Sequence, residues 1–126
     1  MQLSEVQRLL TCDVFWGKEL LGRDIKSGCA SDLMSDVLAF SQSGALLLTG
    51  LVTLQTIQTA FIAEIRAIVF VRGKKPDDDV ISLAKDREIP LLGTSHSMYE
   101  ASGILYQKGV PSTMECPSAV GLTKGI

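Results

Sequence analysis

The sequence has no excess of positive charge: 12 lysines and arginines stand against 14 aspartates and glutamates, for a net charge of −2. Proteins that bind nucleic acids through the phosphate backbone normally carry a basic excess, so nucleic acid is not expected as a partner. No apolar run reaches the ~20 residues that a membrane span needs. The N-terminal segment carries Glu5 and Arg8 where a secretion signal would be apolar, so we expect a cytoplasmic protein with no membrane partner.

Cysteine and histidine are scarce, which limits the cofactors that the chain could hold. Cys12, Cys29 and Cys116 are widely spaced and form no CxxC pair, and His96 is the only histidine. Zinc sites and redox motifs usually place cysteines in such pairs, and an iron–sulfur cluster usually takes four cysteine ligands. We therefore expect no metal, no other cofactor and reduced thiols. Cys29, in a Gly-Cys-Ala-Ser stretch, is the one thiol whose loop could give it a function.

Signatures of common enzyme classes are also missing. The sequence contains no GxxxxGK[ST] phosphate-binding loop, no GxSxG nucleophile elbow and no HExxH zinc motif. It therefore predicts a protein that is not an enzyme. One enzymatic alternative stays open, because Asp32 and Asp36 at i and i+4 could share a helix face and hold magnesium, with His96 as a base. That arrangement would suit a small metal-dependent enzyme acting on a phosphorylated metabolite.

The sequence does contain enough apolar residues for a core, 46% of 126, arranged as alternating helix and strand patterns. The length is typical of one domain. Predicted strands cover 13–16, 25–29, 45–49, 67–71 and 89–92; predicted helices cover 4–10, a segment after Ser31, 53–65, a segment from Pro76, and 97–107. Within this domain, residues 1–24 hold the first helix and a short strand, 25–110 form the α/β core, and 111–126 form an irregular tail.

Capping residues and apolar spacing locate the helices. Ser4 and Ser97 each begin a capping box, Ser31 can cap the second helix, and Thr53 and Asp77 open the next two. The apolar face of each helix should turn toward the core. That face is predicted to comprise Leu33, Val37, Leu38 and Phe40 in the second helix, and Leu54, Ile57, Phe61 and Ile65 in the third.

Strand–helix alternation predicts βαβ units, a parallel sheet and the α/β fold class. The loops that follow parallel strands emerge at one edge of the sheet, where open α/β sheets bind ligands. Here those loops supply glycines, hydroxyls and cations beside helix N-termini, a combination that attracts phosphate groups. Turn, capping and solvation roles could explain each loop singly, but their coincidence at one edge favours a ligand. The predicted ligand-binding residues are Asp32, Thr49, Gly50, Arg72, Gly73, Lys74, Thr94, Ser95 and His96.

Several segments resemble the DRTGG domain, over about residues 25–110. They are the strand end Thr49-Gly50, the strand 67–71, the segment 89–94 and the helix start Ser97-Met98-Tyr99-Glu100-Ala101. Segments 32–39 and 71–76 resemble a narrower group of small stand-alone DRTGG proteins, which are often encoded beside iron-only hydrogenase genes in anaerobic bacteria. The chain departs from the name-giving motif, because Arg72-Gly73-Lys74 stands where Thr-Gly-Gly would follow the strand.

This resemblance implies a three-layer α/β/α fold with a mostly parallel sheet, similar to the N-terminal domain of HPr kinase/phosphorylase. It also implies a regulatory role, without kinase activity. We therefore predict a non-catalytic regulatory or ligand-binding module that forms a homodimer and binds a nucleotide or another phosphorylated anion at the carboxyl edge of the strands. The main alternative is a protein-interaction accessory factor for a hydrogenase or a signalling partner.

Overall fold

Five strands form one sheet, in the order β1-β5-β4-β3-β2, within residues 1–113, the part of the chain that the computed structural model describes. The strands are β1 (Asp13–Trp16), β2 (Ser27–Ala30), β3 (Ala45–Thr49), β4 (Ala67–Phe70) and β5 (Leu91–Gly93). From β2 to β5 all neighbours run parallel, and β1 joins β5 antiparallel. The predicted α/β class with a mostly parallel sheet is confirmed, although β2 and β5 each begin two residues later than the sequence suggested.

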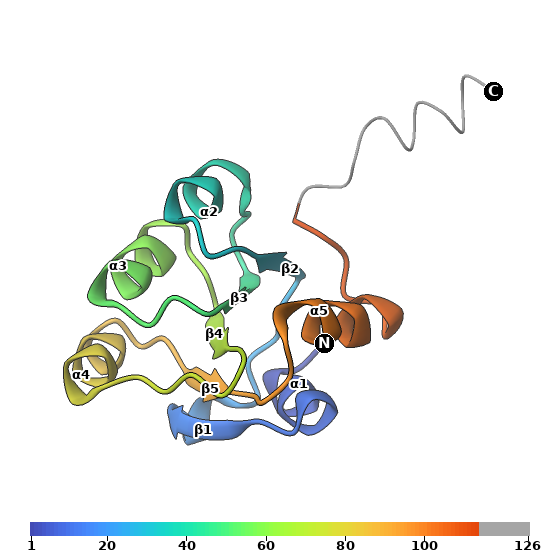
Figure 1. Ribbon diagram of the computed structural model, residues 1–126, viewed down its shortest axis with the longest axis horizontal. Helices are drawn as coiled ribbons and strands as arrows, with labels where there is room; N and C mark the ends of the chain where they lie inside the picture. Colours follow the sequence, from blue (N-terminus) through green and yellow to red (C-terminus); the bar gives the residue numbers. More distant parts are fainter. Residues whose placement is uncertain (114–126) are drawn as a thin grey trace.

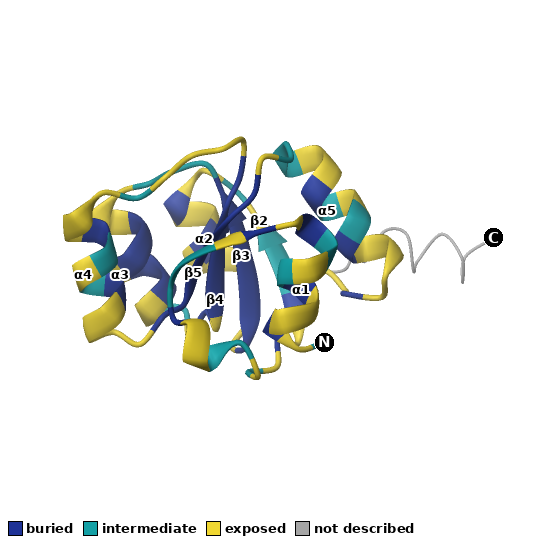
Figure 2. Ribbon diagram, turned by 90° about the horizontal axis from the view of Figure 1, so that it is seen from below, coloured by how far each residue is buried: buried dark blue, intermediate teal, exposed yellow. Residues whose placement is uncertain are grey.

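Helices cover both faces of this sheet and complete three layers (Figure 1). One face carries α2 (Met34–Phe40), α3 (Leu54–Ile62) and α4 (Asp78–Asp86), and the other carries α1 (Leu3–Leu10) and α5 (Met98–Gln107). A 3₁₀ turn, η1 (Lys18–Leu20), follows β1. Every residue of β3, β4 and β5 is buried, as expected for parallel strands covered on both faces (Figure 2).

Among the helices that follow the parallel strands, only the one after β5 lies on a different face. The helices that follow β2, β3 and β4 all pack on one face, whereas α5 packs on the opposite face beside α1. In open α/β sheets a crevice forms where two neighbouring strands send their connections to opposite faces. That condition is met between β4 and β5, so the loops after these two strands are the natural place for a site.

The start of α2 differs from the sequence prediction. Ser31 does not cap the helix; its hydroxyl accepts a hydrogen bond from the Leu33 N–H (3.0 Å) in a turn, and the helix begins at Met34. Such local side-chain bonds compete with helix formation. Asp32 therefore precedes the helix, and the prediction that it shares a helix face with Asp36 is wrong. The buried face of α2 is formed by Met34 and Val37.

For the other helices, three of the predicted N-caps are confirmed and one is wrong. The Thr53 and Ser97 hydroxyls and the Asp77 carboxylate each accept the expected hydrogen bond from a main-chain N–H. Ser4 makes no such bond, because α1 begins one residue earlier with Gln2 as N-cap. Of the faces predicted from apolar spacing, Leu33, Leu38, Phe40, Leu54 and Phe61 are exposed. The buried residues of α3 are instead Thr56, Thr59 and Ala60, beside Ile57.

After α5 the chain returns to the sheet. Gly28 N–H donates to the Pro111 carbonyl (2.8 Å) and Thr113 N–H donates to the Gly28 carbonyl (3.1 Å), so residues 111–113 lie parallel to β2. The rest of the predicted irregular tail, with Cys116, lies outside the described residues. None of the helices in residues 1–113 is long and apolar enough to cross a bilayer.

Candidate functional site

The carboxylate of Asp32 joins the loops that follow β2, β3 and β4. Its Oδ1 accepts a hydrogen bond from the Gly50 N–H (2.6 Å) and another from the Thr49 hydroxyl (3.1 Å). Its Oδ2 forms an ion pair with Arg72 Nη2 (3.5 Å). The structure therefore brings together four of the residues predicted from the sequence, Asp32, Thr49, Gly50 and Arg72, which we call the Asp32 cluster.

Electrostatics favour the charged form of Asp32. The Gly50 N–H lowers the pKa of Asp32 below its ordinary value, and the Thr49 hydroxyl and Arg72 guanidinium lower this pKa further, against the opposing effect of partial burial. A Cβ at position 50 would collide with the Arg72 guanidinium, so a larger residue there would displace the end of the Arg72 side chain. Three of the donors that the sequence assigned to a ligand, Thr49, Gly50 and Arg72, are thus already bonded to a carboxylate of the chain itself.

A second group of predicted residues lines a separate cavity of about 250 Å³ on the β1 side of the same edge. We call it the lysine cavity; its lining includes Asp13, Phe15, Gly73, Lys74, Lys75, Thr94 and Ser95. Within residues 1–113, Lys74 and Lys75 form no ion pair, since the pairs there are Arg8–Glu5, Arg72–Asp32 and His96–Glu100. The two ammonium groups are therefore available to an anion, unlike the Arg72 guanidinium.

Main-chain hydrogen bonds close the crevice between β4 and β5. Arg72 N–H donates to the His96 carbonyl (2.8 Å), and Gly73 N–H donates to the Thr94 carbonyl (2.9 Å). Arg72 adopts a positive φ of 59°, which turns the loop so that both N–H groups reach these carbonyls. The lysine cavity consequently lies beside the closed crevice, between the Lys74 loop and β1.

Two of the predicted residues have their polar groups engaged elsewhere. The buried Thr94 hydroxyl donates to the Leu10 carbonyl (2.6 Å) and accepts from the His96 N–H (3.3 Å). The His96 imidazole lies 3.8 Å from a carboxylate oxygen of Glu100, one turn into α5. Thr94 therefore supports the loop, and His96 lies next to α5 rather than among the residues that line the lysine cavity.

Sequence reasoning missed Asp13 and Phe15. They enter the site because β1 pairs antiparallel with β5, an arrangement that the strand pattern does not reveal. The Phe15 ring packs so closely on Gly93 that a Cβ at that glycine would lie 2.5 Å from the ring. Phe15 thus gives the cavity an aromatic wall, and Asp13 adds a hydrogen-bond acceptor.

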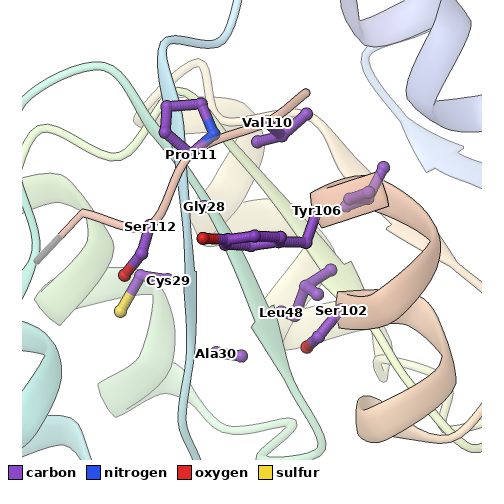
Figure 3. A pocket seen from close by; sticks show the side chains of 10 residues that line it. Gly28, Cys29, Ala30, Leu48, Ser102, Tyr106, Val110, Pro111 and Ser112 are labelled. Carbon is purple, nitrogen blue, oxygen red and sulfur yellow. The ribbon is translucent and has the colours of Figure 1, made fainter. Parts of the chain in front are cut away.

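A further cavity, also missed, lies where β2 faces α5 (Figure 3). This edge cavity measures about 250 Å³, and its lining includes Cys29, Ala30, Leu48, Ser102, Tyr106 and Pro111. Figure 3 shows the Tyr106 ring extending from α5 toward β2. Burial raises the pKa of the Cys29 thiol, opposed by a hydrogen bond with the Thr113 side chain, so the reactive thiolate form is disfavoured. Burial likewise raises the pKa of Cys12 to about 12.

Metal ligation finds no support in these arrangements. No three histidine, cysteine or carboxylate side chains come together in a metal-binding group within residues 1–113. Asp36 lines a different cavity beside β2, with Cys29 and Phe40. Asp32 lies in the loop before α2, so the two carboxylates do not share the helix face on which the enzymatic alternative was based.

Comparison with solved structures finds a match in the CBS and DRTGG domains of the regulatory region of Clostridium perfringens pyrophosphatase, crystallised with the activator diadenosine tetraphosphate. The TM-score is 0.65 at 16% sequence identity, and the match covers 98% of this chain. The chain has a DRTGG-domain-like fold. This finding confirms, for the fold, the DRTGG resemblance predicted from the sequence. The DRTGG-like chain matches 59% of the length of that regulatory-region chain. Neither a protein-family model nor a curated protein matches the sequence.

Proposed function

We propose that this DRTGG-like chain is a non-catalytic regulatory module that binds a phosphorylated small molecule in the lysine cavity. The observation that carries the proposal is that Lys74 and Lys75, which form no ion pair within residues 1–113, line a cavity at the carboxyl edge of a parallel sheet. The sequence pointed to this edge. We assign the anion to Lys74 and Lys75 rather than to Arg72, because the charge of Arg72 is already paired with that of Asp32.

A nucleotide suits this cavity better than a simple phosphate ion. Lys74 and Lys75 match phosphate oxygens, the Asp13 carboxylate can accept from a hydroxyl or amino group, and Phe15 offers a surface for a ring. A volume of about 250 Å³ is small for a whole nucleotide, so part of the ligand would extend along the open edge. The pyrophosphatase regulatory region that shares this fold was crystallised with a dinucleoside polyphosphate activator, which supports the same ligand class.

The experiment is a thermal-shift screen of mononucleotides and dinucleoside polyphosphates, followed by calorimetry on the best binder. A ligand that binds the native state raises the melting temperature by mass action. Lys74→Gln should weaken binding by about 1.5–3 kcal/mol, the value of a charged hydrogen bond. Lys85→Gln, an exposed cation in the last turn of α4, is the matched control and should bind as the wild type does. A screen without any binder, or equal affinities in the two variants, would refute the proposal.

The second candidate function, an accessory factor for a hydrogenase or signalling protein, is favoured by the edge of β2. Residues 111–113 pair with this strand only at Gly28, and the exposed Ala30 continues the strand beside the edge cavity. An extended segment of a partner could add to such an edge. Ala30→Lys should then abolish co-purification of the partner while leaving nucleotide affinity unchanged. Retained co-purification would exclude this edge as the docking strand.

A further inference from the structure

Three arginines surround a cavity at the edge of the sheet opposite the lysine cavity. Arg23 lies before β2, Arg66 immediately before β4, and Arg87 directly after α4. They line a space of about 280 Å³ together with Phe61, Glu64 and Glu88. We call this space the arginine cavity. Nothing in the sequence pattern signalled it, because the three residues lie far apart along the chain.

Contacts with the protein hold each arginine side chain in place. Arg23 Nη1 donates to the carbonyls of Arg66 (3.0 Å) and Glu88 (3.1 Å), and Arg66 Nε donates to the Asp24 carbonyl (3.3 Å). The Arg87 guanidinium lies 4.9 Å from the centre of the Phe61 ring. Within residues 1–113 these contacts leave most of the guanidinium N–H groups without an acceptor. The cavity therefore offers oriented donors.

Within residues 1–113, none of the three arginines of the arginine cavity forms an ion pair with a carboxylate. Glu64 and Glu88 line the same space, yet within the described residues neither carboxylate comes within the 4.0 Å of an ion pair with any of the three arginines. Burial lowers the pKa of Arg23, and the charge of Arg66 lowers this pKa further while Glu88 opposes it. At Arg23, the charge of Arg66 thus outweighs the opposing charge of Glu88.

Helix capping does not account for this cluster. Both α3 and α4 end at the cavity, and cations are favourable near helix C-termini. However, main-chain bonds already serve these ends: Ile65 N–H donates to the Ala60 carbonyl (2.9 Å) and Ile89 N–H to the Ala84 carbonyl (2.9 Å). Arg66 and Arg87 make no side-chain bond to a helical carbonyl of α3 or α4 in the described part of the chain. Their described contacts, with the Asp24 carbonyl and the Phe61 ring, therefore do not serve the helix ends.

We propose that the arginine cavity is a second anion site, which binds the oxyanion group of a small molecule, a phosphate or a carboxylate. The planar fork of each guanidinium matches two oxygens of such a group, which an ammonium cannot do. This site lies at the amino edge of the parallel strands and is independent of the lysine cavity. Its ligand is held by donors from three separate segments of the chain.

The test is an NMR titration of the ¹⁵N-labelled protein with inorganic phosphate and, separately, with malonate, at an ionic strength held constant with sodium chloride. Saturable shifts of the Arg66 and Arg87 side-chain Nε–H signals are expected with at least one probe. Saturation with phosphate alone assigns a phosphate ligand, and saturation with malonate alone assigns a carboxylate. Shifts that grow linearly with both probes would overturn the proposal.

Variants distinguish binding in the arginine cavity from non-specific attraction of anions to the positive charge of the protein. Arg87→Gln removes an exposed side chain whose only described contact is with Phe61, so the fold should persist, and the dissociation constant should rise about tenfold or more. Lys85→Gln removes a neighbouring charge outside the cavity and should change the dissociation constant little. Lys74→Gln should also leave it unchanged, which keeps this test distinct from that of the lysine cavity. Equal effects of Arg87→Gln and Lys85→Gln would show that only net charge matters.

Discussion

A single carboxylate, that of Asp32, holds together the loops that follow β2, β3 and β4. It accepts hydrogen bonds from a main-chain N–H and from a hydroxyl, and it pairs with a guanidinium. About half of the Asp32 and Arg72 side chains remains exposed, at 48% and 45%, so solvent screens the ion pair. The stabilising effect of Asp32 should therefore come mainly from its short bond to Gly50 N–H.

Asp32→Asn should lower the free energy of unfolding by about 1 kcal/mol at neutral pH, because the amide keeps an acceptor but loses the charge. The folded-state pKa of Asp32 is depressed. Its stabilising effect is thus present above the unfolded-state pKa of about 3.9 and is lost as the pH falls through the lower folded-state value. Urea unfolding at neutral pH and at about pH 2 should show the variant and wild type converging in acid.

Asp36→Asn is the control for that comparison, because Asp36 forms no ion pair within the described residues. Its stability should match that of the wild type at both pH values. Equal stability of Asp32→Asn and the wild type at neutral pH would mean that the Asp32 cluster contributes nothing to folding.

Helices α3 and α4 end in the same way, with a glutamate in the left-handed conformation. Glu64 and Glu88 each have a φ of 57°, and the following isoleucine N–H closes the helix end. Side chains disfavour this conformation by about 1–2 kcal/mol, whereas glycine adopts it freely. α5 shows the usual solution, with Gly109 at a φ of 98° beyond its end.

Glu88→Gly should therefore raise the free energy of unfolding by about 0.5–1 kcal/mol. This value is the relief of backbone strain less the cost of the greater conformational freedom of glycine in the unfolded chain. Thermal and urea unfolding measure the change. Glu88→Ala is the matched control, since it removes the same carboxylate but keeps the strained backbone. If Glu88→Ala stabilised the protein as much, relief of charge rather than of backbone strain would be responsible.

At the level of elements, sequence reasoning succeeded where a side chain itself makes the local bond. Thr53, Asp77 and Ser97 cap their helices as predicted, because the side chain of each accepts a hydrogen bond from a main-chain N–H three residues later. The prediction that Ser31 caps α2 was wrong, because its hydroxyl accepts a hydrogen bond from the Leu33 N–H, two residues away. Apolar spacing misplaced the face of α2, since Leu38 and Phe40 are exposed and the burial of a short helix depends on its neighbours.

For the candidate site, the sequence predicted which loops meet at one edge of the sheet but not how the residues of those loops are grouped. Parallel pairing brings Asp32, Thr49 and Arg72 together, and that follows from topology alone. The use of Asp32 as an internal anion depends on hydrogen-bond geometry that no pattern encodes. The contribution of Asp13 and Phe15 depends on the pairing of β1 with β5, a contact across more than seventy residues.

The whole molecule exposes apolar side chains on the outer surface of α2 and α3, which pack against each other. Leu38 and Phe40 are about half exposed, and Ile62 is 69% exposed. Exposed apolar patches commonly mark interfaces, and twofold pairing is the commonest closed assembly. This surface is the place where we expect two copies of the chain to meet.

We predict a homodimer in solution, with a light-scattering mass of two chains at micromolar concentration. Ile62→Lys should shift the mass toward one chain, because it places a charge in the expected interface. Tyr99→Lys, at a residue 90% exposed on α5 across the sheet, is the control and should leave the mass unchanged. A strictly monomeric wild type would refute the prediction.

The close fit between Gly50 and Arg72 has a consequence for how this sequence can drift during evolution. A side chain at position 50 would occupy the space of the Arg72 guanidinium, and a displaced guanidinium would leave Asp32 with one partner fewer. Substitution at any one of these positions therefore changes what the other two can tolerate. We expect homologues to retain Asp32, Gly50 and Arg72 together or to replace them jointly. An alignment would then show the three positions as one covarying set, although they follow three different strands of the sheet.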